Sequence, residues 1–135
     1  MLETLQLMAA GLTNALLPMN LFMMIAGVTL GIVIGCLPGL SAAMGVALML
    51  PLTFTMEPET GLIVLGAIYC GAIFGGSISA ILIHTPGTPA SAATAIEGYQ
   101  MTLQGKAGKA LATACWSSFW GGLLSCISLR HYWHS

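Results

Sequence analysis

Residues 61–83 of the chain read GLIVLGAIYCGAIFGGSISAILI, and residues 84–91, which follow directly, read HTPGTPAS. The first stretch carries no charge and is long enough to cross a bilayer, which takes about 20 predominantly apolar residues. The second contains two prolines and a glycine, so a regular helix cannot continue through it. Because unpaired backbone groups are costly in hydrocarbon, irregular backbone near a membrane must face protein or water. Residues 84–91 are therefore the first candidate for a solute site.

The composition of the whole chain indicates an integral membrane protein. Of its 135 residues, 57% are hydrophobic and 5% are charged, whereas a soluble domain has about 25% charged residues. The mean hydropathy is +0.93, and residues 4–56 contain no charged side chain at all. With a net charge of −1 and no basic patch, the chain offers nothing that would bind nucleic acid.

Three apolar stretches have the length of a transmembrane span or nearly so: from about residue 16 or 21 to 37, residues 61–83, and about 110–129. Residues 42–55 form a shorter apolar segment, which would be a short span or one arm of a re-entrant element. Residues 1–20 contain no Lys or Arg, so they predict an interfacial or amphipathic lead-in helix and not a cleaved signal peptide. We expect an all-α, polytopic membrane helix bundle, a single transmembrane domain over residues 1–135 with about three to five transmembrane segments.

Small residues recur at four-residue spacing in each long stretch: Gly27, Gly31 and Gly35; Ala67, Gly71, Gly75 and Ser79; Ser117, Gly121 and Ser125. This spacing places them on one helix face, where the backbones of two helices can approach closely. Ordinary helix packing is the first interpretation, and a substrate passage lined by backbone is the second. In either case the pattern predicts that each helix has protein neighbours.

The remaining polar and sulfur residues give weaker signals. Four cysteines, at 36, 70, 115 and 126, lie in or at the ends of apolar segments without C-x-x-C spacing, so we expect small buried apolar residues and no disulfide or zinc site. Lys106 and Lys109 lie in the longest polar connection, residues 97–109, which favours a cytoplasmic position for that connection. Arg130, at the far end of the next span, argues mildly the other way.

A second break in the sequence has a pattern similar to that of the first. Pro38-Gly39-Leu40-Ser41-Ala42-Ala43 follows one apolar helix, as residues 86–93, PGTPASAA, follow another. Proline and glycine end each helix, and Ser41 and Ser91 would each provide the N-cap of a new one. The N-terminus of such a helix suits a carboxylate or another anion. Interrupted hydrophobic segments at corresponding places point to the binding site of secondary transporters, although a purely structural helix end is an equal alternative.

Six strings of the sequence resemble one known family: GCLPGLS at 35–41, LPLTF at 50–54, YCGAIFGGSI at 69–78, ILIHTPGTP at 81–89, ATAIEGY at 93–99 and QGKAGKAL at 104–111. In this order they are similar to the large membrane subunit of the tripartite tricarboxylate transporters, the TctA family. The resemblance covers about residues 20 to 125. It is far more specific than hydrophobic composition alone would produce.

The resemblance implies a carrier in the bacterial inner membrane that takes up citrate or other di- and tricarboxylates. An ion gradient drives uptake, which implies a coupling cation, Na⁺ or H⁺, and no other cofactor. Two protein partners are implied, a small membrane subunit and a periplasmic solute-binding protein. Both breaks match the family pattern, and their small and hydroxyl residues become the candidate substrate-binding groups: Gly39, Ser41, Thr85, Gly87, Thr88, Ser91 and Thr94.

His84 departs from the family, which more often has asparagine or another small polar residue at this position. No second histidine stands at metal-ligand spacing, so we expect no metal site here. A histidine beside a solute path could alter substrate preference or make activity pH-sensitive, because histidine titrates near neutrality. Ser77 and Ser79 lie within eight residues of His84, but neither G-x-S-x-G nor H-E-x-x-H is present, so we expect no catalytic residues and no enzyme.

Other departures concern the family pattern and the length. Glu97 replaces the usual aspartate before Gly-Tyr, and Gln100 replaces the usual proline after it. Family members are several times longer, and residues 126–135, CISLRHYWHS, form an atypical tail that does not look like the family's continuing apolar helix. We therefore expect an N-terminal fragment of a larger carrier, inactive alone. The alternative is a small accessory or assembly membrane protein with no transport activity of its own.

Overall fold

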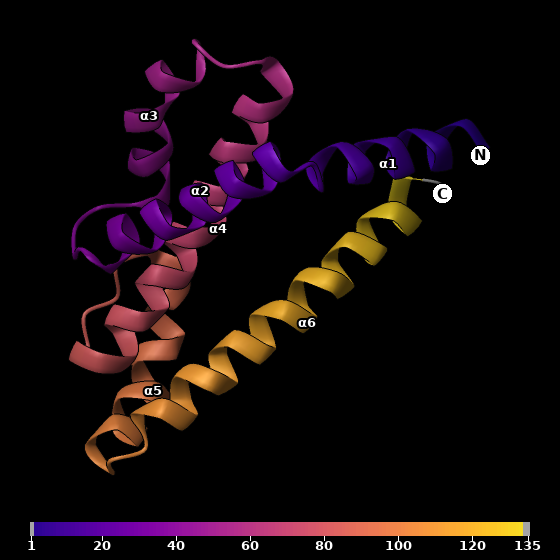
Figure 1. The fold of residues 1–135 in the computed structure, drawn as a ribbon. Coiled ribbons are helices and arrows are strands. Elements are labelled where there is room, and N and C mark those ends of the chain that lie inside the picture. Colours follow the sequence, from indigo (N-terminus) through magenta and orange to yellow (C-terminus); the bar gives the residue numbers. More distant parts are fainter. Residues whose placement is uncertain (1, 134–135) are drawn as a thin grey trace.

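The computed structural model of the chain describes residues 2–133, and within them it contains α-helices and one 3₁₀ turn but no strand. The α-helices are α1 (Leu2–Ala15), α2 (Pro18–Cys36), α3 (Ala42–Thr53), α4 (Pro58–Ile83), α5 (Ala92–Leu103) and α6 (Ala107–Trp133). The 3₁₀ turn η1 (Pro89–Ser91) leads directly into α5. Figure 1 shows α2, α3 and α4 clustered together, with α6 extending away from them. The predicted all-α fold is confirmed.

Three of these helices, α2, α4 and α6, are long and apolar enough to cross a membrane, as predicted. They contain 19, 26 and 27 residues. α2 and α4 each have a proline in the first turn, where the missing N–H costs no hydrogen bond. α3 has only 12 residues, about 18 Å of helix, so it is too short to span a bilayer by itself. The chain is a multi-pass membrane protein.

α2 and α4 pack in parallel and in backbone contact. A Cβ atom on Gly27 would lie 3.0 Å from Cβ of Ala67, and one on Gly31 would overlap the carbonyl oxygen of Ile68. A Cβ on Gly35 would overlap the carbonyl oxygen of Ala72. Because the partners' numbers rise together along both helices, the helices run in the same direction, and α3 returns the chain between them (Figure 1). The predicted packing role of the small-residue faces is confirmed for α2 and α4.

The small-residue face of α6 has no such neighbour among the described residues. Nothing lies within 4 Å of the position a Cβ would take on Gly121 or Gly122. Within the apolar 18-residue core of each helix, only 6% of α6 is buried, whereas 44% of α4 is buried. Within residues 2–133, α6 therefore packs against α4 and α5, as expected of each helix, but its small-residue face takes no part in this packing.

Several details of the sequence interpretation are corrected. Three of the four cysteines (Cys70, Cys115 and Cys126) are exposed and not buried, because glycine and alanine occupy the contact face of α4 and because α6 has few neighbours among the described residues.

The bounds of three segments also differ from the prediction. The polar connection expected over 97–109 is mostly helix, since α5 extends to Leu103. The lead-in segment is a separate helix, α1, which ends three residues before Pro18 begins α2. In the atypical tail, residues 126–133 continue α6, and His134 and Ser135 lie outside the described residues.

Candidate functional site

The two breaks in the sequence meet at adjacent glycines of α4. At the end of α2, the Cys36 thiol donates to the carbonyl oxygen of Gly75 at 3.5 Å. From the second break, Thr88 packs on Gly76, where an added Cβ would lie 2.9 Å from the Thr88 Oγ1. A Cβ on Gly87 would overlap the carbonyl oxygen of Gly35, just before the first break. The structure therefore brings together segments that lie about fifty residues apart in the sequence.

This meeting point lies along α4 and not at its end. Gly76 is seven residues before Ile83, the last residue of α4, which corresponds to about 10 Å along the helix axis. After His84 the chain thus turns back along α4 until residues 87 and 88 reach the level of Gly76. Such a return places irregular backbone beside protein, as the hydrocarbon environment requires.

The hydroxyl groups of the second break bond to each other. Ser91 is fully buried, and Thr88 is 5% exposed. The Ser91 hydroxyl donates to the Thr88 carbonyl oxygen at 2.8 Å and accepts from the Thr88 N–H at 3.3 Å. The bond from the Thr88 N–H to Ser91 is one half of a capping box for η1, and the Thr88 side chain accepts from the Ser91 N–H in the other half.

The prediction that Ser91 caps the following helix is therefore wrong. Its side chain makes no capping hydrogen bond to α5. The physical reason is Pro89, which starts a short 3₁₀ turn in front of α5, so that the hydroxyl of Ser91 is used inside this turn. Thr88 and Ser91 hold the shape of the second break.

The first break has an open side. Gly39 adopts a left-handed backbone with φ of 96°, and no atom lies within 4 Å of the position of its absent Cβ. Ser41 accepts a hydrogen bond from the Met44 N–H at 3.3 Å, so its predicted role as N-cap of α3 is confirmed. Leu37, Pro38 and Gly39 are all exposed. The first break is therefore exposed, beside the buried turn of the second.

His84 ends α4 in the left-handed conformation, with φ of 56° and ψ of 24°. Asparagine, aspartate and histidine tolerate this conformation better than other residues with a Cβ. The asparagine that the resemblance implies for the family at this position would satisfy the same backbone requirement. The ring packs on Tyr99 at a centroid distance of 4.7 Å, and its Nδ1 lies 3.1 Å from the carbonyl oxygen of Ala95. His84 therefore joins the end of α4 to α5.

The other predicted site residues take separate places. Thr85 is exposed and donates to the carbonyl oxygen of Ile83 at 3.3 Å, and Thr94 lies half-buried on α5. Of the predicted set, Gly87, Thr88 and Ser91 come together at the meeting point, whereas Gly39, Ser41, Thr85 and Thr94 do not join that contact.

Sequence reasoning did not assign Gly35, Gly76 and Ser79 to the site. The Ser79 Oγ lies 3.3 Å from the position of a Cβ on Gly87, and it donates to the carbonyl oxygen of Gly76 at 3.0 Å. The four-residue spacing of small residues was a signal for Gly35 and Ser79, because both belong to it. Gly76 lies outside that spacing, so only its contact with Thr88 reveals it.

A separate polar cluster lies at the opposite end of α4. Asn20 is 6% exposed, donates to the Asn14 carbonyl oxygen at 2.8 Å and accepts from the Thr60 hydroxyl at 2.9 Å. The Asn14 amide in turn donates to the Glu59 carboxylate. These bonds tie the first turns of α2 and α4 to the end of α1. Within the described part of the chain, no group of three or more His, Cys, Asp or Glu side chains could hold a metal ion.

Comparison with known proteins assigns the chain to a family. The family profile described as "Tripartite tricarboxylate transporter TctA family" matches residues 21–132, which include both breaks. A protein from Agrobacterium vitis, "Uncharacterized 52.8 kDa protein in TAR-I ttuC' 3'region", is 46% identical over 129 residues. The match covers 96% of this chain and 26% of that relative, so the chain spans about a quarter of the relative's length. No solved structure matches the chain. Because the family profile matches most of its length, the chain belongs to the tripartite tricarboxylate transporter TctA family.

Proposed function

We propose that this chain forms part of the membrane subunit of an ion-gradient-driven carrier for tricarboxylates or related carboxylates. The observation that carries the proposal is the meeting of the two breaks at Gly75 and Gly76 of α4. Broken helices that meet inside a bundle are the usual setting of a substrate site in secondary transporters. Family membership supports a carboxylate as the solute.

In this proposal the substrate lies at the first break, on accessible backbone around Gly39 and the hydroxyl of Ser41. The N-terminus of α3 begins there, and its unpaired N–H groups and positive dipole end favour a carboxylate. Next to the first break, Gly87 packs on Gly35 of α2, and Thr88 packs on Gly76 of α4. The proposed coupling cation is Na⁺ or H⁺. If it is Na⁺, backbone carbonyl oxygens near the breaks would be its ligands.

The proposed partners are a periplasmic solute-binding protein and a small membrane subunit, and the proposed location is the bacterial inner membrane. Because the matched relative is about four times as long as this chain, we propose that transport needs the remainder of the carrier as well. The chain alone would then be inactive, and it would act as a carrier component and not as an enzyme.

Uptake measurements test the proposal. The chain would be expressed in bacterial cells alone, and also within a full-length carrier with its binding protein and small subunit, while uptake of radiolabelled citrate and a panel of other di- and tricarboxylates is followed. We expect uptake only with the complete set, and its loss when a protonophore and a sodium ionophore collapse both gradients.

Two variants locate the site within the complete carrier. Ser41→Ala removes a hydroxyl from the proposed substrate place, so we expect weaker substrate affinity. Thr29→Ala, which removes a hydroxyl that bonds within α2 itself, serves as the matched control and should leave uptake unchanged. Failure of the complete set to take up any carboxylate of the panel would contradict the carrier proposal and favour an accessory or assembly role, whereas uptake by the chain alone would contradict the requirement for the remainder.

A further inference from the structure

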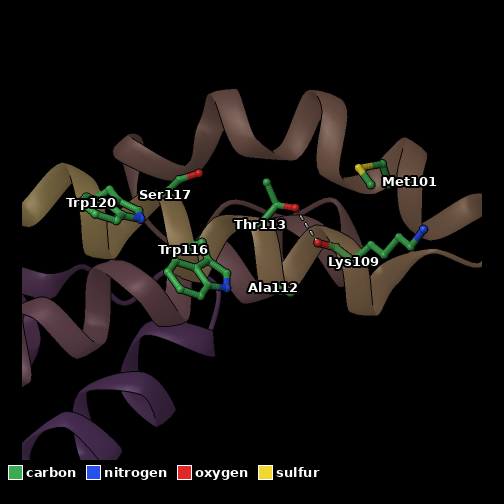
Figure 2. A pocket seen from close by; sticks show the side chains of 7 residues that line it. All are labelled: Met101, Lys109, Ala112, Thr113, Trp116, Ser117 and Trp120. Atoms are coloured by element: carbon green, nitrogen blue, oxygen red, sulfur yellow. Dashed lines mark hydrogen bonds between the residues drawn. The ribbon is translucent and has the colours of Figure 1, made fainter.

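A groove of about 570 Å³ lies between α5 and α6, at a distance from the two breaks. Its lining combines one cationic side chain with aromatic, hydroxyl and aliphatic groups: Met101 from α5, and Lys109, Ala112, Thr113, Trp116, Ser117 and Trp120 from α6. Figure 2 shows Lys109 and Met101 at one end of the groove and Trp120 at the other. The groove is therefore polar at one end and aromatic at the other.

The length of the groove corresponds to one leaflet of a bilayer. Lys109 lies in the first turn of α6, and Trp120 follows eleven residues later, about 16 Å along the helix axis. Half of the hydrocarbon thickness of a bilayer is about 15 Å. A phospholipid whose phosphate lies at Lys109 would thus place an acyl chain along the groove as far as Trp120.

The aromatic side chains of the groove face outward from the bundle. Trp116 is 64% exposed and Trp120 is 56% exposed, on a helix that has few protein neighbours. Phe119 lies between them and meets both rings edge to face, at centroid distances of 6.5 Å and 6.0 Å. These contacts line up three aromatic side chains along α6 and leave apolar surface available for a lipid chain.

We propose that this groove is a binding site for an anionic phospholipid. Lys109 is one of three Lys or Arg residues in the chain and the one basic residue among those that line the groove. It lies next to the α5–α6 connection, which contains Lys106, and these two lysines favour the cytoplasmic side, where the leaflet carries anionic lipids. Basic pockets between transmembrane helices on that side suit anionic headgroups. The site is independent of the proposed transport function, since it shares no residue with the two breaks.

Fluorescence quenching by lipids with brominated acyl chains tests the site directly. The chain has three tryptophans, so Trp133→Phe would be present throughout and the emission would come from Trp116 and Trp120 alone. In mixed micelles of the purified chain, brominated phosphatidylglycerol and brominated phosphatidylcholine would be titrated separately. We expect half-maximal quenching at a roughly fivefold lower mole fraction of phosphatidylglycerol, the preference that one basic residue near the headgroup provides.

Three variants test whether the preference for phosphatidylglycerol depends on Lys109. Lys109→Gln should bring the two quenching curves together, whereas Lys109→Arg should keep them apart. Lys106→Gln removes the same charge from an exposed residue that does not line the groove, so the preference should survive. Identical curves for both lipids in the parent protein, or an equal loss of preference in Lys106→Gln and Lys109→Gln, would overturn the proposal.

Discussion

At the scale of single residues, the distance between α2 and α4 depends on glycines that admit no side chain. A Cβ on Gly35 would overlap the Ala72 backbone, and neither helix can move away without losing the contacts of Gly27 and Gly31 as well. We predict that Gly35→Ala lowers the free energy of unfolding by about 1–3 kcal/mol, the usual cost of overpacking. Unfolding would be followed by circular dichroism during titration of mixed micelles with sodium dodecyl sulfate.

Gly66→Ala is the matched control for this prediction. Gly66 also lies in the interior of a helix, but no atom is within 4 Å of the position of its Cβ. Alanine there should be neutral or stabilising by up to about 1 kcal/mol, because glycine is the poorer helix former. Equal destabilisation by both substitutions would show that the close approach of α2 and α4 does not limit stability.

The left-handed backbone of His84 gives a second prediction at this scale. His84→Asn should lower the free energy of unfolding only by the contribution of the ring contacts with Tyr99 and Ala95, since asparagine also tolerates this conformation. His84→Val should lower it by at least about 1–2 kcal/mol, because a left-handed conformation is strained for such a residue. His84→Gly also tolerates the left-handed conformation and loses the same ring contacts, so it should resemble His84→Asn. Valine as stable as asparagine would contradict the conformational explanation.

The hypothesis that His84 makes transport pH-sensitive can be tested with the same asparagine variant. Within a full-length carrier, His84→Asn keeps the backbone geometry and removes the titratable ring, so any difference in uptake between pH 5.5 and 8 reports on that ring. We expect the parent carrier to vary with pH over this range and the variant to vary less. An identical pH profile in both would exclude His84 as the pH-sensitive group.

At the scale of elements, the attachment of α1 depends on the polar cluster of Asn14, Asn20, Glu59 and Thr60. α1 has no buried residue, so apolar contacts contribute little to holding it. We predict that Asn20→Ala increases the amide hydrogen exchange of α1 severalfold while the exchange of α4 stays unchanged, because the bonds to Asn14 and Thr60 are lost together. Mass spectrometry of peptides from α1 and α4 would measure this.

Thr29→Ala provides the control for Asn20. The Thr29 hydroxyl also lies in α2, but it bonds to the carbonyl oxygen of Ile25 in its own helix and links no second element. Its loss should leave exchange in α1 unaltered. If both variants released α1 equally, a general weakening of α2 would explain the effect better than the polar cluster.

The elements also show what the sequence could and could not predict. The three spans follow from length and hydropathy, and the ends of α2 and α4 follow from the Pro-Gly breaks. The start of α5 after Ser91 was predicted, but its extension to Leu103 was missed, because Gly98, Gly105 and several polar residues give residues 97–109 the composition of a loop. Only Gly105 has the left-handed backbone of a turn, whereas Gly98 lies inside α5, where a Cβ would come within 2.7 Å of Ile81. A sequence shows a glycine but not whether it serves a turn or a close contact.

At the scale of the whole molecule, α4 is the centre on which the rest is assembled. It packs against α2, α3 and α5 and against the start of α6. The parallel arrangement of α2 and α4 brings the two breaks to one level, which no local pattern in the sequence could indicate. It requires α3 to return the chain across much of the bundle, and a Cβ on Gly61 would indeed lie 3.4 Å from the Thr53 side chain. The candidate site is thus a product of topology more than of either break alone.

This topology predicts on which sides of the membrane the connections lie. Thr55 lies between α3 and α4, near the first turn of α4, whereas Gln104 follows Thr102, whose hydroxyl donates to the carbonyl oxygen of Ile81 in the last turn of α4. The two residues should therefore be on opposite sides, with Gln104 in the cytoplasm beside Lys106 and Lys109. In a background with all four cysteines replaced by serine, Thr55→Cys and Gln104→Cys would be labelled with a membrane-impermeant maleimide.

We expect Thr55→Cys to be labelled in intact spheroplasts and Gln104→Cys only in inside-out vesicles. Both positions are exposed and uncharged, so neither substitution alters the distribution of basic residues that orients the chain. Labelling with the sides exchanged would reverse the orientation but keep the fold. Labelling of both from the same side would mean that α4 does not cross the membrane, and since the two breaks meet on α4, the candidate site would then lose its place within the bilayer.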